Sequence, residues 1–231
     1  MAILGFAFDL EGTVIDVETA HHHGHLATAA ELGVMLTLDE ALQKLPHFIG
    51  GPDEAICEEI WRFSDQTTSL ATIIERDKFH YHRLLKELPI VPRPGFLECS
   101  AHLDRLGIKK SIGSLTGTIE ANTLLERSGL SKIFDRSVTV LREDVQNIKP
   151  APDVFLETAR RMGIQPNQQL VFEDSSRGVQ AARAAGSLAI GMPVYHRPEV
   201  IASLKTAGAL HIFMDWHEIS EEKILSFLDH P

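Results

Sequence analysis

The chain has 231 residues, of which 44% are hydrophobic, and its 32 acidic and 22 basic residues give a formal net charge of -10. This charge argues against nucleic acid or an anionic membrane surface as the main partner, because both are negatively charged. The two cysteines form no metal or disulfide pattern, and neither a secretory leader nor a membrane-length apolar segment is apparent, so we expect a cytoplasmic protein.

The first predicted element is a buried strand over the apolar residues 3–8. It ends in two carboxylates, Asp9 and Glu11, and Gly12 then allows the backbone to turn away. Carboxylates at the end of a buried strand are unfavourable unless a positive group compensates them. A metal ion, a lysine or a phosphate-handling site would meet that need.

Residues 17–91 are predicted to be helical, with no strand among them. The expected helices cover residues 18–32, 37–45, 53–63 and 69–88. Thr37 and Glu40 have the spacing of a capping box, which opens the second of these helices. Gly50, Gly51 and Pro52 form a turn before the third helix.

From residue 93 onward, helices and strands alternate. Predicted helices cover residues 96–106, 119–128, 152–162, 179–185 and 221–228, and predicted strands cover residues 108–113, 136–141, 169–172, 188–191 and 211–214. This alternation is typical of a doubly wound parallel sheet with helices on both faces. We therefore predict an α/β core, residues 1–16 and 93–231, interrupted by a helical insertion, residues 17–92.

The carboxyl ends of parallel strands are where such sheets bind ligands. The residues expected there are mainly acids and small hydroxyl residues, joined by one lysine from a loop: Asp9, Glu11, Ser114, Leu115, Thr116, Lys149, Glu173 and Asp174. Clustered carboxylates need a divalent cation, and oxygen-only ligands suit Mg²⁺. A hydroxyl at a helix start binds phosphate oxygens, a lysine neutralises charge, and an aspartate can act as the nucleophile. The residues therefore indicate phosphoryl transfer.

Four segments resemble the motifs of the haloacid dehalogenase-like hydrolases, in the subfamily that carries a helical cap after the first strand and includes phosphoglycolate phosphatases and β-phosphoglucomutases. The segments are residues 9–14 (DLEGTV), Ser114, residues 149–153 (KPAPD) and residues 172–179 (FEDSSRGV). The resemblance implies a Rossmann-like core with the helical segment 17–92 as its cap domain.

The resemblance also implies a role for each matched residue. Asp9 would be the nucleophile, Glu11 the acid/base, Ser114 and Leu115 the phosphate-binding residues, and Lys149 the partner of Asp9 and phosphate. Mg²⁺ would be held by Asp9, the backbone carbonyl of Glu11, Glu173 and Asp174. In the cap, His21 would face the substrate cleft, and His47, Gly50 and Gly51 lie in a loop that is expected either to contact substrate or to be only a turn.

Glu11 departs from the family pattern, which has aspartate at the acid/base position. Its side chain is one methylene longer, about 1.5 Å, and misplacement on that scale can lower a rate roughly a hundredfold. We therefore predict low activity on generic phosphate esters.

A histidine-rich segment, His21-His22-His23 and His25, has two interpretations. Positions 21 and 25 share a helical face and could belong to a metal cluster. A solvated or hinge helix is the favoured interpretation.

The function predicted from these residues is that of a Mg²⁺-dependent phosphatase, a monomer or homodimer, acting on a small phosphorylated metabolite. One alternative is a β-phosphoglucomutase-like phosphohexomutase, which is less favoured because residues 47–53 contain no Lys or Arg. Another is a weakly active or non-catalytic binding protein, which Glu11 suggests.

Overall fold

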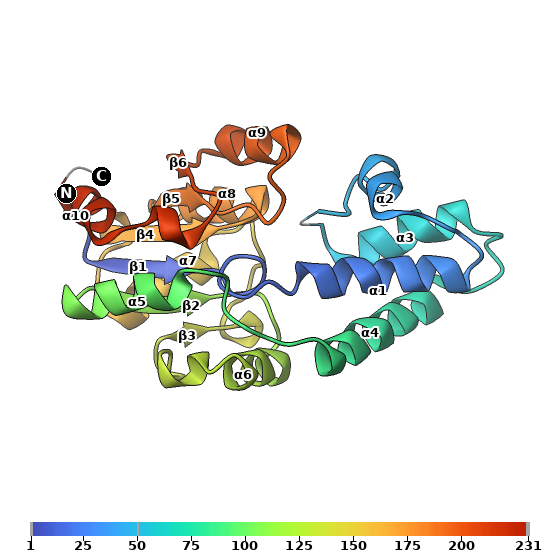
Figure 1. Ribbon diagram of the computed structural model, residues 1–231, viewed down its shortest axis with the longest axis horizontal. Coiled ribbons are helices and arrows are strands. Elements are labelled where there is room, and N and C mark those ends of the chain that lie inside the picture. Colours follow the sequence, from blue (N-terminus) through green and yellow to red (C-terminus); the bar gives the residue numbers. More distant parts are fainter. Residues whose placement is uncertain (1, 50, 230–231) are drawn as a thin grey trace. The chain divides into compact units, whose positions relative to one another are not determined.

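The computed structural model describes residues 2–49 and 51–229. The chain divides into two compact units (Figure 1): residues 1–16 together with 90–231, and residues 17–89. Each unit is described separately below.

The first unit contains, within the described residues, a six-stranded parallel sheet in the order β3-β2-β1-β4-β5-β6. Its strands are β1 (Gly5–Phe8), β2 (Lys109–Gly113), β3 (Thr139–Val140), β4 (Gln169–Glu173), β5 (Leu188–Gly191) and β6 (His211–Ile212). Every residue of β1 and β4 is buried, as expected for strands covered on both faces. The predicted α/β fold with a parallel sheet is confirmed.

Helices cover both faces of this sheet. Helix α5 (Phe96–Arg105), with α10 (Glu221–Asp229) packed beside it, lies on one face, and α7 (Asp153–Met162) and α8 (Ser176–Ala184) lie on the other (Figure 1). The outer strands are joined through α6 (Thr118–Arg127) and α9 (Pro198–Ala207). Aromatic rings fill the core beside β1, with centroids 5.4 Å apart for Phe8–Phe172 and 5.0 Å apart for Phe96–Trp216.

The strand order reverses at β1, which lies between β2 and β4. The chain first builds outward to β2 and β3 and then returns through α7 to β4 on the other side of β1. Open sheets of this kind have a crevice at such a reversal, outside the carboxyl ends of the strands. Asp9 follows β1 directly and therefore lies at this position.

Two predicted strands are shorter in the structure, and one helix was not predicted. The predicted strands 136–141 and 211–214 are each only two residues long, Thr139–Val140 and His211–Ile212. Both are edge strands, and before β3 the carboxylate of Asp135 accepts a hydrogen bond from the Ser137 N–H (2.7 Å), which favours a turn over a strand. Helix α9 was not predicted, although Pro198 at its first position is a common start signal.

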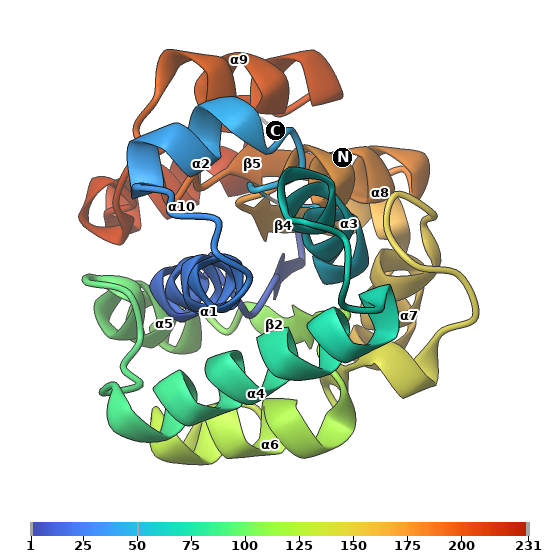
Figure 2. The same ribbon diagram turned by 90° about the vertical axis from the view of Figure 1, so that its right-hand side faces the viewer.

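The second unit is helical: α1 (Glu18–Glu31), α2 (Leu38–Lys44), α3 (Asp53–Phe63) and α4 (Leu70–Glu87). Helix α1 contacts the other three and lies among them (Figure 2). The predicted capping box is confirmed, because Glu40 N–H donates to Thr37 Oγ1 (3.2 Å) and Thr37 N–H donates to Glu40 Oε2 (2.9 Å). An apolar cluster holds this unit together, comprising Ala29, Ala41, Leu45, Phe48, Ile56 and Ile60.

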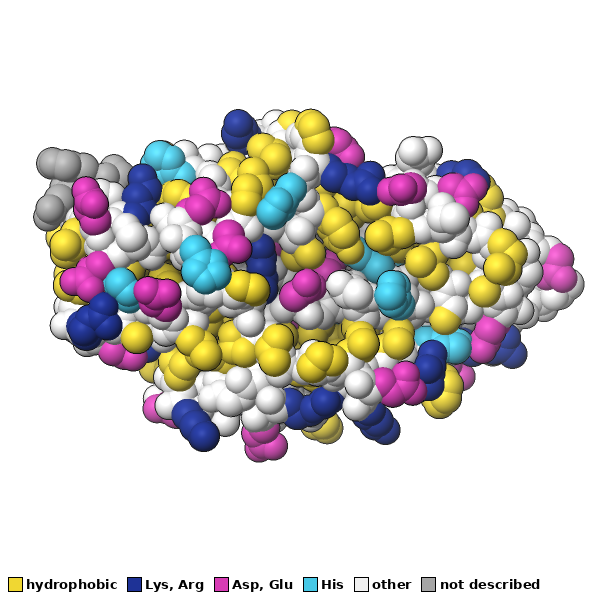
Figure 3. Space-filling view, viewed as in Figure 1, with side chains coloured by type: hydrophobic (Ala, Val, Ile, Leu, Met, Phe, Trp, Pro, Cys, Tyr) yellow, Lys and Arg dark blue, Asp and Glu magenta, His cyan; other side chains and the backbone are white. Residues whose placement is uncertain are grey.

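The surface carries charges of both signs. In Figure 3, acidic and basic side chains are interspersed over the visible face. Among the described residues, none of the helices combines the length and the apolar character that crossing a bilayer requires.

Candidate active site

Asp9 is fixed at the carboxyl end of the central strand. Its backbone N–H donates to the carbonyl of Phe172 on β4 (3.0 Å), and the residue is only 7% exposed. Gly12 then adopts a φ of 79°, which glycine tolerates better than other residues, and its N–H donates to the carbonyl of Ile15 (2.7 Å). This tight loop leaves the Asp9 carboxylate at the carboxyl end of β1.

Lys149 joins three strand ends. Its Nζ donates to Asp9 Oδ1 (2.6 Å), to Glu173 Oε1 (2.5 Å) and to the carbonyl of Gly113 (3.2 Å). The backbone carbonyl of Lys149 in turn accepts a hydrogen bond from the Arg177 guanidinium (2.6 Å). The buried lysine therefore ties β1, β2 and β4 together at the strand ends.

The charges at this point do not balance. Burial raises the pKa of Asp9 to about 7, against the effect of Lys149, and Glu173 raises it further. Burial alone would lower the pKa of Lys149, but Asp9 and Glu173 outweigh it and raise that pKa above its ordinary value. Lys149 therefore stays protonated, and once Asp9 ionises, this one positive charge faces two buried carboxylates.

A divalent cation fits this excess of negative charge. Oxygen atoms of Asp9, Glu173 and Asp174 lie within 4.8 Å of one another. Asp174 Oδ1 accepts a hydrogen bond from Thr13 Oγ1 (3.3 Å). A set of carboxylate oxygens without nitrogen or sulfur suits Mg²⁺ and similar hard cations.

The carboxylate of Glu173 is enclosed by the start of α8. Its Oε2 accepts hydrogen bonds from the Ser175 N–H (3.2 Å) and hydroxyl (3.0 Å). A Cβ placed on Gly178 would lie 1.8 Å from Glu173 Cδ, so a side chain there would displace the carboxylate. Gly178 is thus required by the close approach of Glu173, a contact that the sequence reasoning did not identify.

A second polar group lies where the chain leaves β2. Thr116 Oγ1 donates a short hydrogen bond to Glu11 Oε1. Because the Thr116 hydroxyl has one hydrogen, the 2.8 Å contact with Ser114 must be donated by Ser114 Oγ. Leu115 is half-buried in the same loop. The sequence places Thr116 at a strand end, as predicted, but assigns it no role, and no sequence signal pairs it with Glu11.

The loop after β1 is held by two residues that the sequence did not single out. Arg93 donates to the carbonyls of Gly12 and Met192, both at 2.7 Å. Trp216 Nε1 donates to the Thr13 carbonyl (3.0 Å). These bonds join distant segments, so local sequence patterns could not have revealed them.

The other predicted residues belong to the helical unit. His21 stacks on Tyr81, with ring centroids 3.7 Å apart, and His47 Nδ1 lies 2.6 Å from Glu59 Oε1. Gly51 follows Gly50, which lies outside the described residues.

Comparisons with known proteins agree on one family. The family model for haloacid dehalogenase-like hydrolases matches residues 3–186. A fructose-1-phosphate phosphatase of Escherichia coli is 31% identical over 200 residues, covering 80% of this chain and 94% of that protein. A phosphorylated carbohydrates phosphatase of Thermotoga maritima is 30% identical over 224 residues, covering 96% of each chain.

Solved structures extend the likeness over almost the whole chain. A haloacid dehalogenase-like protein from Agrobacterium tumefaciens superposes with a TM-score of 0.84 at 22% identity, covering 99% of this chain and 100% of that one, which shows the shared fold. A proposed β-phosphoglucomutase from Thermotoga maritima superposes with a TM-score of 0.75 at 27% identity, covering 98% and 99%. The chain belongs to the haloacid dehalogenase-like hydrolases.

Proposed function

We propose that this chain is a Mg²⁺-dependent phosphatase that hydrolyses a small phosphorylated metabolite through an aspartyl-phosphate intermediate. The observation that carries the proposal is the Asp9 carboxylate, buried at the end of β1 and 2.6 Å from Lys149 Nζ. The E. coli and T. maritima relatives, named as phosphatases of fructose 1-phosphate and of phosphorylated carbohydrates, support a sugar phosphate as the substrate.

In the first step, an Asp9 carboxylate oxygen attacks phosphorus. A bond forms between that oxygen and phosphorus, the bond from phosphorus to the ester oxygen breaks, and Glu11 gives its proton to the leaving oxygen. In the second step, Glu11 takes a proton from water, the water oxygen bonds to phosphorus, and the bond between Asp9 and phosphorus breaks. Inorganic phosphate is released and Asp9 is regenerated, while Lys149 remains protonated and offsets the charge of the phosphoryl oxygens.

Asp9, Asp174 and the backbone carbonyl of Glu11 would hold Mg²⁺, and Glu173, whose oxygens also bind Lys149 and Ser175, would complete the set. A bound Mg²⁺ would supply positive charge beside the phosphoryl oxygens. The loop containing Ser114 and Leu115 would bind one of these oxygens.

Glu11 is the residue that limits the proposed turnover. Its carboxylate accepts a hydrogen bond from Thr116, which would hold it while it acts on the leaving oxygen. We therefore expect measurable activity on a preferred substrate and low activity on generic phosphate esters.

The test is a phosphate-release screen over sugar phosphates and other small phosphate esters, with Mg²⁺ and with EDTA. We expect Mg²⁺-dependent release from a narrow set of sugar phosphates. Asp9→Asn keeps the shape of the side chain, but its amide is a poor nucleophile, so the variant should release no phosphate. Its thermal unfolding midpoint should match that of the wild type, which shows that the variant is folded. Full release by Asp9→Asn would refute the mechanism.

A second candidate is a phosphohexomutase, which the 27% identity to a proposed β-phosphoglucomutase favours. Segment 47–53 contains no Lys or Arg for a second phosphate group, and this favours the phosphatase. Incubation with glucose 1-phosphate separates the two, since a mutase produces a sugar 6-phosphate and a phosphatase produces inorganic phosphate.

A further inference from the structure

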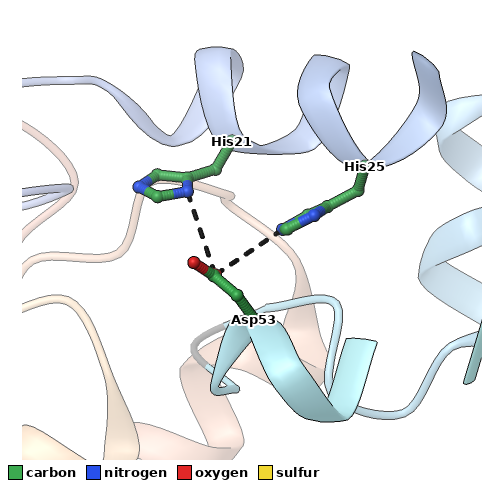
Figure 4. A group of neighbouring side chains, drawn as sticks. All are labelled: His21, His25 and Asp53. Carbon is green, nitrogen blue, oxygen red and sulfur yellow. Dashed lines mark ion pairs between the residues drawn. The ribbon is translucent and has the colours of Figure 1, made fainter. Parts of the chain in front are cut away.

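Helix α1 directs two of its histidines toward the start of α3. His21 and His25 are one turn apart and share a face of the helix, and Asp53 is the first residue of α3 (Figure 4). Asp53 Oδ1 lies 4.0 Å from His21 Nδ1 and 3.9 Å from His25 Nε2. All three residues belong to the helical unit, residues 17–89.

His25 is oriented by a buried carboxylate. Its Nδ1 lies 2.9 Å from Asp77 Oδ1, which also accepts a hydrogen bond from Thr28 Oγ1 (2.9 Å). Because a carboxylate oxygen accepts, His25 Nδ1 carries the hydrogen, and in the neutral imidazole Nε2 has a lone pair facing Asp53. A carboxylate bound to one imidazole nitrogen while the other binds a metal is a common arrangement in proteins.

The separations around Asp53 fit an ion better than hydrogen bonds. Distances of 3.9 and 4.0 Å exceed those of N–H···O hydrogen bonds. The candidate ligand atoms of His21, His25 and Asp53 all lie within 4.8 Å of one another. Ligands about 2.0–2.1 Å from a tetrahedral zinc ion are about 3.3 Å from one another, so the two distances to Asp53 would have to shorten by about 0.6–0.7 Å on metal binding. His25 is 2% exposed, whereas the Asp53 side chain is 38% exposed, which leaves room for water as a further ligand.

We propose that His21, His25 and Asp53 form a site for a divalent transition-metal ion of the Zn²⁺ class, with Asp77 as the positioning residue for His25. Two imidazole nitrogens and one carboxylate oxygen suit Zn²⁺, Co²⁺ or Ni²⁺, whereas Mg²⁺ prefers oxygen ligands. The site is therefore chemically distinct from the carboxylate group at the strand ends. The competing explanation is a protonated His25 that forms ion pairs with both Asp53 and Asp77.

The experiment is a titration of the full chain, without an affinity tag and treated with chelator, with Co²⁺ in excess Mg²⁺, which occupies the oxygen-only site. We expect one equivalent of Co²⁺ with the absorption bands of a nitrogen–oxygen site, displaced by Zn²⁺. His21→Gln and Asp53→Asn should each weaken Co²⁺ binding at least tenfold. The matched controls His23→Gln and Glu54→Gln, at exposed positions on the same two helices, should bind Co²⁺ as the wild type does.

Asp77→Asn should weaken Co²⁺ binding by about 10–100-fold, since it removes the partner that orients His25. If this buried variant fails to fold, the substitutions at the partly exposed His21 and Asp53 still decide the question. Co²⁺ binding that survives both of those substitutions would place the ion elsewhere and overturn the proposal. An absence of Co²⁺ binding, together with nitrogen NMR shifts of a doubly protonated His25, would identify the ion-pair explanation instead.

Discussion

Gly178→Ala tests whether Glu173 must keep its place for the chain to act as a phosphatase. The new Cβ would lie 1.8 Å from Glu173 Cδ and 1.9 Å from Oε1. Carbon atoms in contact are about 3.5 Å apart, so the carboxylate must withdraw by about 1.7 Å. That movement breaks its 2.5 Å contact with Lys149.

Two effects of opposite sign determine the stability of this variant. A hydrogen bond between charged groups contributes about 1.5–3 kcal/mol, and alanine is favoured over glycine in a helix by about 1 kcal/mol. The variant should therefore lose about 0.5–2 kcal/mol of its free energy of unfolding. Displacement of a site group by more than 1 Å should lower kcat/KM about a hundredfold.

The assay combines phosphate release, measured against Mg²⁺ concentration, with chemical denaturation. Gln180→Ala is the matched control, because it places an alanine at an exposed position of the same helix. If Gly178→Ala kept the wild-type kcat/KM, or if its free energy of unfolding rose by about 1 kcal/mol as helix propensity alone predicts, the proposed place of Glu173 in the site would be wrong.

Three further predictions follow from the same contacts. Thr116→Val should lower kcat about tenfold or more, because it releases the Glu11 carboxyl that acts on the leaving oxygen. Thr116→Ser keeps the hydroxyl and should keep the wild-type kcat. Steady-state kinetics on the same substrate compares the two variants. Lys149→Met should abolish phosphate release and lower the free energy of unfolding by about 3–5 kcal/mol, because it leaves Asp9 and Glu173 buried without a counter-charge. Denaturation in Mg²⁺-free buffer measures the loss of stability, and a stable, active variant would contradict the prediction. Burial lowers the pKa of His22 from 6.5 to about 4. Between pH 6.5 and about pH 4, His22 is therefore protonated in the unfolded chain but neutral in the folded one, so stability is lost as the pH falls through this window. On acidification from pH 7 to pH 4, the free energy of unfolding of the wild type should therefore fall by up to about 3 kcal/mol more than that of His22→Gln. Equal losses in the two proteins would contradict this prediction.

Local sequence patterns determined much of the secondary structure. Helix α3 has the predicted bounds, and the capping box of Thr37 and Glu40 lies where it was predicted, because both depend on residues close together in the chain. The order of strands and helices also predicted a parallel sheet. The same order places Asp9, Lys149 and Glu173 near the strand ends without any knowledge of their contacts. Their roles in catalysis stay a proposal.

Only the tertiary structure decided which side chains meet. Thr116 contacts Glu11 across 105 residues of sequence, and Asp77 contacts His25 across 52, separations over which no periodicity or spacing rule operates. The favoured interpretation of the histidine segment was a solvated or hinge helix. Of its two parts, the solvated one describes only the exposed His23 well, since His22 and His25 are 1% and 2% exposed. Burial and the pairing of charges depend on how the helices and strands pack, and packing sets the ligand geometry on which both proposed sites depend.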